Sequence, residues 1–504
     1  MLQKKQFPFY VFLFSIYPVL ALLATNIAEV NIRVVFRPLF ASLILASLLF
    51  VIMRLILKNW QQGALIATVI LVCFFSYGHV YNLVRQISFA LARHRYLIPI
   101  YVILFGILLW YTSKKVKDVA SITIVINIVS IALLIFPAYR IISFTISNVY
   151  QEQSISEKSD LVQLTLPSPL PDVYYIVLDT YMREDALLRD MNFDNSEFIS
   201  QLETMGFYVA DCSRSNYSYT LASMTSALNM AYMSDLNLDN PKNPWLLLKQ
   251  SKTRRQLEEI GYRTVAFETR YEWSRLDDAD ILLGIGRDPA NLQTLYPFEV
   301  MFLKTTALLI PLDLNLKILS NGAGDGMFEY QYHVDLERFI LNELPKISKI
   351  SGPKFVFVHI LIPHVPYVFD SQGEVRTDPG FYSGKLATAI DEEYLMAGYN
   401  GEIEFINAQM LNIFNEIIKA SSTPPIIIMH GDHGLRDDNH LQILNAYYFP
   451  RDGNLNLYPN ITPVNSFRVM FNTYFGTNYD ILPDLSYHGE PLMLIPETAP
   501  ECQE

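Results

Sequence analysis

The segment PPIIIMHGDHGLRDDNH, residues 424–440, runs from an apolar stretch directly into His430, Asp432 and His433. The apolar part predicts a buried β-strand, and glycine and aspartate are ordinary turn residues. Aspartate and histidine are also ligands of Zn²⁺ and Mn²⁺, and glycine lets a backbone bend tightly around an ion. On its own the segment is compatible with a polar turn or with a metal site.

Two further apolar runs carry metal-capable side chains at their ends. DVYYIVLD (172–179) ends in Asp179, and KFVFVHI (354–360) contains His359 and is followed by His364. The carboxyl ends of parallel strands meet at one edge of a sheet, which is where ligands bind in open α/β sheets. Three strands that deliver such side chains to one edge therefore favour the metal site over the polar turn.

Helical stretches alternate with these strands. SEFISQLETMGF (196–207) and IEFINAQMLNIFNEIIKA (403–420) have apolar residues near helical spacing, and TRRQLEEIGYRTVAFE (253–268) reads as a helix, a glycine stop and a strand. This alternation predicts an α/β domain with a mostly parallel sheet sandwiched by helices. Residues 172–504 are enough for one large core, so we expect a single domain there.

The first 145 residues are far more apolar than the rest of the chain. The 504 residues together are 51% hydrophobic, with a mean hydropathy of +0.21, but the long apolar runs all lie in this part. A helix needs roughly 20 apolar residues to cross a bilayer. We expect a transmembrane bundle of five helices in residues 1–145, at about 8–26, 39–57, 63–83, 96–113 and 119–139.

Basic residues in the loops predict how these helices are oriented, because Lys and Arg concentrate on the cytoplasmic side. The KKVK cluster before the fifth span favours a cytoplasmic N-terminus. Five spans then place everything after residue 145 outside the cytoplasm, on a multi-pass protein of the cell membrane. In this orientation the inner side carries Lys4, Lys5, Arg54, Lys58, Lys114, Lys115 and Lys117, and the outer side carries Arg33, Arg37, Arg85, Arg93 and Arg95.

A short polar segment separates the apolar part of the chain from the rest. Residues 146–171 are polar and end in prolines, which predicts a linker.

The cysteines predict no disulfide framework and no zinc ribbon, since Cys73 lies in an apolar run and only Cys212 and Cys502 remain for the soluble half. The net charge of −12 argues against a nucleic-acid binder, because neutralising phosphates needs a basic surface.

The segment SNYSYTLASMTSALNM (215–230) is dense in hydroxyl groups and then becomes small and apolar. It predicts a helix whose N-cap is Ser218 or Thr220. The N–H groups at a helix N-terminus stabilise an anion, and a bound metal lowers the pKa of a hydroxyl. A capping hydroxyl here is therefore also well placed to act as a nucleophile.

The motifs YIVLDTYMR, the hydroxyl-rich helix start, PHVP and HGDHG occur in the order typical of the sulfatase-like branch of the alkaline phosphatase superfamily, which the chain resembles. Together with five N-terminal spans, they are similar to membrane-anchored lipoteichoic acid synthases and lipid A phosphoethanolamine transferases. The resemblance implies an alkaline phosphatase/sulfatase-like fold for the catalytic domain. It also implies one divalent metal ion, zinc or manganese, held by Asp179, Thr220, Asp432 and His433.

Thr220 stands where sulfatases carry the cysteine that is oxidised to formylglycine, and a threonine is what the phospho-transferring relatives use. Ser218 and Ser223 are alternative nucleophiles. His364 and His440 are suited to binding the phosphate or protonating the leaving group, and Arg183 could pair with an anionic oxygen.

The resulting hypothesis is a membrane-bound enzyme that transfers a phospho-substituent through Thr220. Its donor would be a membrane lipid, because a soluble substrate would not need five spans, and its acceptor a surface glycan or lipid. The alternatives are an extracytoplasmic phosphate or sulfate ester hydrolase of the same superfamily and a non-catalytic binding relative.

Overall fold

The computed structural model describes residues 6–28, 30, 32–88, 91–116, 118–157, 161–236, 245–271, 273–285, 297–313, 327–376, 392–435, 441–488, 493–495 and 502. The chain divides into two compact units, which are described separately. The first comprises Met1–Ser147 and Arg287–Phe328, and the second Asn148–Gly286 and Glu329–Glu504. The sequence analysis assigned all of residues 172–504 to one domain, so the placement of 287–328 in the first unit is a departure.

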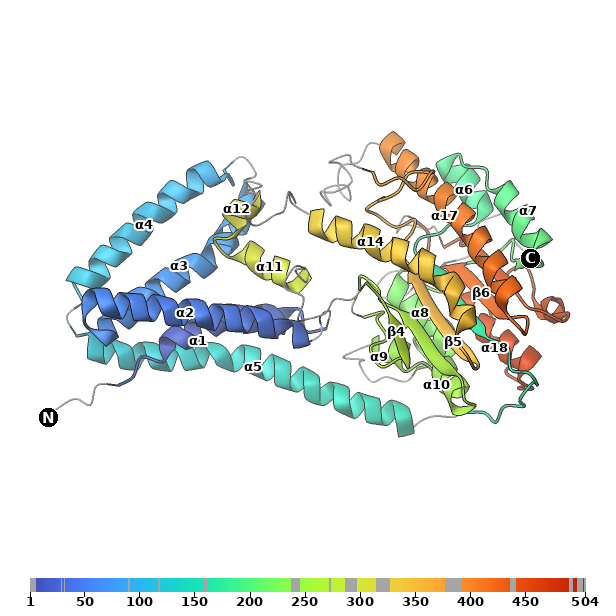
Figure 1. Ribbon diagram of the computed structural model, residues 1–504, viewed down its shortest axis with the longest axis horizontal. Helices are drawn as coiled ribbons and strands as arrows, with labels where there is room; N and C mark the ends of the chain where they lie inside the picture. Colours follow the sequence, from blue (N-terminus) through green and yellow to red (C-terminus); the bar gives the residue numbers. More distant parts are fainter. Residues whose placement is uncertain are drawn as a thin grey trace. The chain divides into compact units, whose positions relative to one another are not determined.

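Long apolar helices build the first unit (Figure 1). Four of them are long and apolar enough to cross a membrane, and the helix before them is apolar but has only 16 residues. They correspond to the five predicted spans. The bounds are α1 (Tyr10–Thr25), α2 (Phe36–Leu57, preceded by the 3-10 helix η1 at Ile32–Val35), α3 (Trp60–Ile87), α4 (His94–Lys114) and α5 (Val119–Glu157).

Small residues let these helices approach one another closely, which is typical of packing between membrane helices. Ala46 on α2 and Ala64 and Ala67 on α3 are all buried in the core of the first unit. At Gly63 a Cβ atom would lie only 2.8 Å from the backbone nitrogen of Arg54 on α2. The contact between α2 and α3 therefore depends on glycine at this position.

Two short helices from the second half of the sequence also belong to the first unit. They are α11 (Pro297–Thr305) and α12 (Leu309–Asp313), and we call residues 297–313 the inserted helix pair. Phe298 and Phe302 of α11 are buried in the same apolar core as residues of α1 and α3.

A seven-stranded sheet forms the centre of the second unit, in the order β2-β7-β6-β1-β5-β3-β4. The strands from β6 to β4 run parallel, and β7 and β2 add antiparallel pairs at one edge. The predicted α/β class with a mostly parallel sheet is confirmed. The strands are β1 (Val173–Leu178), β2 (Tyr208–Val209), β3 (Arg263–Phe267), β4 (Ile281–Leu283), β5 (Lys354–Ile360), β6 (Ile426–Gly431) and β7 (Asn445–Tyr448), with a separate pair of β8 (Tyr487–His488) and β9 (Met493–Leu494).

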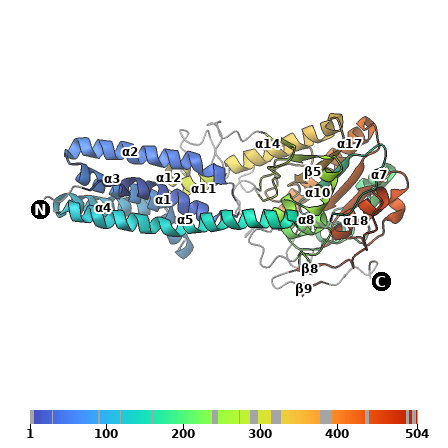
Figure 2. The same cartoon turned by 90° about the horizontal axis from the view of Figure 1, so that it is seen from below.

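Helices cover both faces of this sheet (Figures 1 and 2). Successive side chains of β1 alternate between two apolar cores, so that Tyr174 enters one and Tyr175 the other. One core is closed by α6 (Glu184–Met191), α7 (Ser196–Thr204), α14 (Met327–Glu343) and α17 (Glu392–Ala420), and the other by α8 (Thr220–Asn229), α9 (Trp245–Lys249), α10 (Lys252–Glu259) and α18 (Pro463–Tyr474). Short 3-10 helices lie at η2 (Leu344–Lys349) and η3 (Gly453–Asn456).

The predicted linker, residues 146–171, is largely structured. Helix α5 continues through Glu157. Further on, the Thr165 N–H donates to the Phe475 carbonyl, and the Tyr262 hydroxyl donates to the Pro171 carbonyl. The segment from residue 161 to 171 therefore packs on the second unit.

Cys212 and Cys502 form a disulfide, with 5.4 Å between their Cα atoms and 290 residues between them in sequence. The expectation that the second half carries no disulfide was wrong. Two cysteines this far apart have no recognisable spacing, and only the fold brings the C-terminal tail against the loop after β2.

Candidate active site

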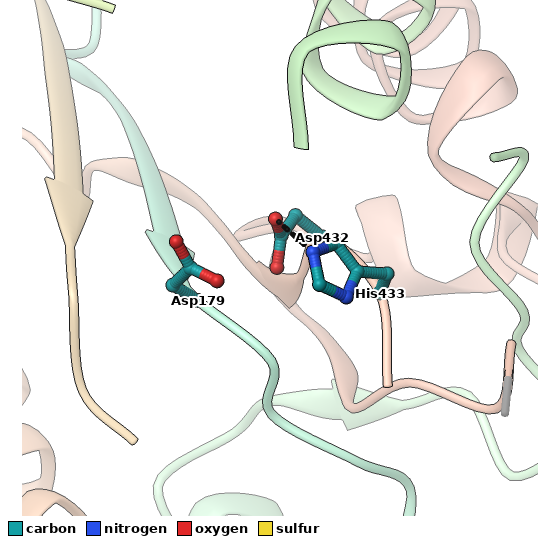
Figure 3. Close-up of side chains that lie close together, drawn as sticks. All are labelled: Asp179, Asp432 and His433. Atoms are coloured by element: carbon teal, nitrogen blue, oxygen red, sulfur yellow. Dashed lines mark ion pairs between the residues drawn. The ribbon is translucent and has the colours of Figure 1, made fainter. Parts of the chain in front are cut away.

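Three adjacent parallel strands bring the predicted metal ligands to one edge of the sheet. In the register of the sheet, Leu178 at the end of β1 pairs with Ile360 of β5 and with Gly431 of β6. Asp179 and Asp432 are the next residues after β1 and β6, so their side chains emerge side by side. Figure 3 shows the two carboxylates next to each other, with the His433 ring beside Asp432.

These side chains form a site that fits a cation. Asp179, Asp432 and His433 each offer one ligand atom, and these atoms lie within 4.8 Å of one another. Both aspartates are buried, and the Oδ1 atom of Asp179 and the Oδ2 atom of Asp432 have no hydrogen-bond partner among the described residues. Buried carboxylate oxygens are normally paired, and a metal ion would supply the partner that these two atoms need.

The backbone around Thr180 fixes the orientation of Asp432. Thr180 has a φ of 64°, in the left-handed region that a threonine rarely adopts. Its N–H donates to Asp432 Oδ1 at 2.8 Å, and its carbonyl accepts from the Tyr399 hydroxyl at 2.7 Å. One carboxylate oxygen of Asp432 is therefore held by the protein, and the other is left for the cation.

The first glycine of the HGDHG motif allows the two strand ends to touch. A Cβ atom at Gly431 would lie 2.1 Å from the Tyr181 carbonyl oxygen. The sequence analysis gave glycine the role of bending the backbone around an ion. The structure gives Gly431 a different role, because it lies inside β6 and permits close backbone contact with the segment after β1.

His433 connects the carboxylates to the helix that carries the candidate nucleophile. Its Nδ1 lies 2.8 Å from the Gly434 carbonyl, so this nitrogen carries the proton and Nε2 presents its lone pair. Nε2 lies 3.3 Å from Asp432 Oδ2 and 3.2 Å from Thr220 Oγ1. Thr220 is the first residue of α8, and the cap residue Tyr219 makes no side-chain cap. The hydroxyl therefore faces the metal-capable cluster.

The charge on Asp179 is stabilised by neighbouring histidines. Burial alone would raise the pKa of this carboxyl group, but His364, His359 and His433 together lower it below its usual range. His359 Nε2 lies 3.3 Å from Asp179 Oδ2. Asp179 is thus ionised at any physiological pH, as a metal ligand must be.

The other histidine of the motif, His430, is held inside the sheet. Its Nδ1 donates to the Gly431 carbonyl at 2.7 Å, and its Nε2 accepts from the Tyr175 hydroxyl at 2.8 Å. Burial lowers the pKa of His430 to about 4. The ring is therefore neutral, and both of its nitrogens are engaged away from the cluster.

The remaining predicted site residues are His364, Arg183 and His440, and their surroundings differ. His364 is half-buried, and its Nδ1 contacts the Val365 carbonyl at 2.6 Å, while its charge acts on Asp179. The guanidinium group of Arg183 donates to both oxygens of Asp185 and to the Ser213 carbonyl. Arg183 is thus held by protein partners, and its predicted pairing with an anionic oxygen of the substrate stays a prediction. His440 lies outside the described residues.

Two of three comparisons with known proteins return nothing. A scan against protein-family models finds no match, and a search of curated proteins finds none either.

Solved structures give distant similarities. The chain is similar to the C-terminal periplasmic domain of EptC from Escherichia coli in complex with zinc, at 13% identity over 63% of this chain and 84% of that chain, with a TM-score of 0.40. It is similar to the integral membrane protein lipooligosaccharide phosphoethanolamine transferase A (EptA) from Neisseria meningitidis, at 13% identity over 92% and 95%, with a TM-score of 0.35. A third is the phosphonate monoester hydrolase of Agrobacterium radiobacter, at 14% identity over 63% and 80%, with a TM-score of 0.36.

The sequence analysis missed a group of residues after β3. This strand is parallel to β5, so the segment that follows it reaches the same edge of the sheet. The Trp273 ring lies 6.2 Å from the His359 ring, and Arg270 Nη1 lies 3.4 Å from His333 Nδ1. The strand RTVAFE was recognised in the sequence, and its position beside β5 is the signal that could have pointed to Arg270.

Helix α14 places two buried titratable groups behind the site. Burial lowers the pKa of His333 well below its ordinary value, with Arg270 and His364 acting in the same direction. Burial also raises the pKa of Glu337 to about 8, and its Oε1 accepts the Leu361 N–H at 3.3 Å. Both groups are therefore uncharged at neutral pH, and among the described residues Asp179 and Asp432 are the carboxylates that lie in the metal-capable cluster.

Proposed function

We propose that the second unit is a metal-dependent phosphotransferase that uses Thr220 as its nucleophile and takes a phospho-substituent from a membrane lipid. The observation that carries this proposal is the contact of 3.2 Å between Thr220 Oγ1 and His433 Nε2. This contact brings a hydroxyl to the cluster of Asp179, Asp432 and His433, at the N-terminus of a helix whose first N–H groups have no helical partner.

Asp179, Asp432, His433 and Thr220 would hold one divalent ion, for which zinc and manganese both suit the donor set. A bound ion supplies a lowered pKa for the Thr220 hydroxyl and positive charge for the phosphoryl oxygens. The chain itself contributes the fixed position of the hydroxyl and the N–H groups of the first turn of α8. These donors can stabilise charge on the equatorial oxygens during transfer.

The reaction would proceed in two steps. Thr220 Oγ releases its proton to solvent and bonds to the phosphorus of a lipid phosphodiester, the bond from phosphorus to the lipid alcohol breaks, and the leaving oxygen takes a proton from His364. An acceptor hydroxyl then attacks the phosphothreonine and gives up its proton, the bond from phosphorus to Thr220 Oγ breaks, and Thr220 and His364 are protonated again. If water is the attacking group instead, the same site is a hydrolase.

His364 is placed to supply the proton for the leaving group. Its Nδ1 is occupied by the Val365 carbonyl, and Nε2 has no hydrogen-bond partner within the described part of the chain. A histidine that is held through one ring nitrogen and exposes the other can act as a general acid. Arg270, whose positive charge acts on His333 and Glu337 behind the site, adds positive potential for an anionic substrate.

We further infer that the second unit lies outside the cytoplasm, where a lipid donor and a surface glycan or lipid acceptor are within reach. The disulfide between Cys212 and Cys502 supports this location, because disulfides persist in oxidising compartments. The apolar helices of the first unit support membrane attachment.

The test is peptide mass spectrometry of the full-length protein after incubation with a bacterial phospholipid extract. Thr220→Val removes the hydroxyl but keeps the shape of the side chain, and Thr220→Ser keeps a hydroxyl. Ser218→Ala and Ser223→Ala are matched controls on the same segment. We expect a mass increment on residues 215–230 in the wild type, the serine variant and both controls, but none in Thr220→Val.

The size of the increment would identify the transferred group. An increment that persists in Thr220→Val and disappears in Ser218→Ala or Ser223→Ala would assign the nucleophile to that serine. Phosphate release without any increment would support the hydrolase. If the protein neither retains a metal nor forms an adduct, the proposal fails in favour of a binding module.

A further inference from the structure

The inserted helix pair is a part of the second half of the sequence that joins the membrane-spanning helices. Its sequence, PFEVMFLKTTALLIPLD (297–313), is largely apolar. Helix α11 has nine residues and α12 has five, so neither can cross a bilayer. An apolar segment of this length is instead expected to lie at a membrane interface or against other helices.

Close backbone contact fastens the inserted helix pair to α3. The Ala307 N–H donates to the Phe74 carbonyl at 2.8 Å. A Cβ atom at Gly78 would lie 2.1 Å from the Lys304 carbonyl oxygen and 2.5 Å from the Thr305 carbonyl carbon. Glycine is therefore required at position 78 for this contact.

An ion pair at one end and a hydrogen bond at the other hold the inserted helix pair. Arg37 at the start of α2 pairs with the buried Glu299 at 3.1 Å. His94 at the start of α4 contacts Asp313 at 2.9 Å through Nε2 and the Tyr77 hydroxyl at 2.8 Å through Nδ1. Charged groups among membrane helices are costly unless they are paired, so these pairs fix one specific docked arrangement.

A cavity of about 360 Å³ lies beside this contact, and Thr305 of the inserted helix pair forms part of its wall. The rest of the wall comes from α1, α3 and α5, and none of the lining residues is Asp, Glu, Lys or Arg. Along α1 the lining passes from Phe14 to Thr25, and along α3 it passes from Val72 to His79. The wall is thus mostly apolar, and its polar side chains are Tyr17, Thr25, Ser76, His79 and Thr305.

We propose that this cavity binds one acyl chain of a bilayer glycerophospholipid, and that the inserted helix pair completes the site. Its volume is in the range of small-ligand pockets, roughly 300–1,000 Å³. Val72 and Leu133 on the wall are partly exposed, at 42% and 36%, on helices that would face lipid. An apolar channel without Asp, Glu, Lys or Arg that opens on such a surface suits an acyl chain, and His79 can hydrogen-bond to its ester group.

The site can be tested without any reference to transfer chemistry. The full-length protein is reconstituted in vesicles of phosphatidylethanolamine and phosphatidylglycerol that contain a phosphatidylethanolamine with a diazirine in one acyl chain. After irradiation, peptide mass spectrometry gives the labelling of residues 14–25 and 72–79. The exposed face of α4, which includes Val102, Ile103 and Ile107, is the internal standard for contact with bulk lipid.

Two variants should reduce the ratio of cavity to α4 labelling by roughly tenfold. Ala21→Phe fills the cavity, and Gly78→Val displaces the inserted helix pair. The matched controls are Ala41→Phe, on an exposed position of α2, and Gly106→Val, where a Cβ atom would meet nothing within 4 Å. Both controls should leave the ratio unchanged.

Equal ratios in the wild type and Ala21→Phe would overturn the proposal, whatever Gly78→Val does. A reduction in Ala21→Phe but not in Gly78→Val would overturn the part played by the inserted helix pair. Wild-type labelling of the cavity no higher than that of α4 would show that the cavity is not a lipid site.

Discussion

Asp432 both joins two strand ends and offers a candidate ligand for the metal. Its Oδ1 accepts the Thr180 N–H, which joins the ends of β6 and β1, and its Oδ2 faces the site with no described hydrogen-bond partner. An asparagine can keep the first contact through its carbonyl oxygen. It cannot supply a second anionic oxygen, so this position allows the fold and the metal site to be tested separately.

We expect Asp432→Asn to reduce metal retention at least tenfold, since even residues that only support metal ligands cost about 10–100-fold when changed. The melting temperature in the presence of a chelator should stay close to that of the wild type. Metal content of the purified protein by mass spectrometry measures the first effect. Asp370→Asn is the control, because Asp370 caps a turn through the N–H groups of Gln372 and Glu374; equal metal content in both variants would contradict the assignment of Asp432.

At the scale of the element, α14 carries a carboxyl group that is neutral in the folded protein. Burial, aided by the charge on Asp179, raises the pKa of Glu337 from 4.5 to about 8. The unfolded chain loses this proton near pH 4.5, whereas the folded protein keeps it until about pH 8. Between these values the unfolded state binds fewer protons, so the free energy of unfolding falls as the pH rises.

Glu337→Gln should remove this loss of stability, because glutamine is uncharged at every pH and its side-chain oxygen can still accept the Leu361 N–H. Because of this group, the free energy of unfolding of the wild type is expected to fall by on the order of a few kcal/mol between pH 5 and pH 8. The free energy of unfolding of the variant should not show this fall. The measurement is the melting temperature of the full-length protein against pH. Asp335→Asn, at an exposed position on the same helix, should follow the wild type, and an identical profile for Glu337→Gln would refute the raised pKa.

At the scale of the whole molecule, the disulfide is a long-range constraint. Cys212 and Cys502 close a loop of 290 residues that includes most of the second unit. Cross-linking residues this far apart restricts the unfolded chain strongly, and native disulfides typically contribute about 2–5 kcal/mol.

Replacing Cys212 with serine should lower the melting temperature of the second unit by several degrees, and a reducing agent should have the same effect on the wild type. Cys73→Ser is the matched control, because Cys73 is a half-buried free thiol on α3. Peptide mapping under non-reducing conditions should show the linked pair when the protein is prepared from its native membrane. A free Cys212 thiol in that preparation would contradict both the disulfide and the location outside the cytoplasm.

Local sequence determined those features that depend on the periodicity and length of single segments. The apolar runs before residue 145 require helices of membrane-spanning length, and β1, β5 and β6 are read directly from continuous apolar runs because both faces of a central parallel strand are buried. Asp179, Asp432 and His433 were predictable for the same reason, since they immediately follow those strands.

Only the tertiary structure decided which distant residues meet. It brings the Arg183 guanidinium to the Ser213 carbonyl and Arg270 to His333 behind the site. It also pairs Cys212 with Cys502 and returns the inserted helix pair to the membrane-spanning helices. None of these contacts can be recognised from a periodic pattern in the sequence, because each joins segments that are far apart along the chain. The physical reason is that strand order and helix packing determine which side chains from different elements become neighbours. No short segment of sequence encodes that order or packing.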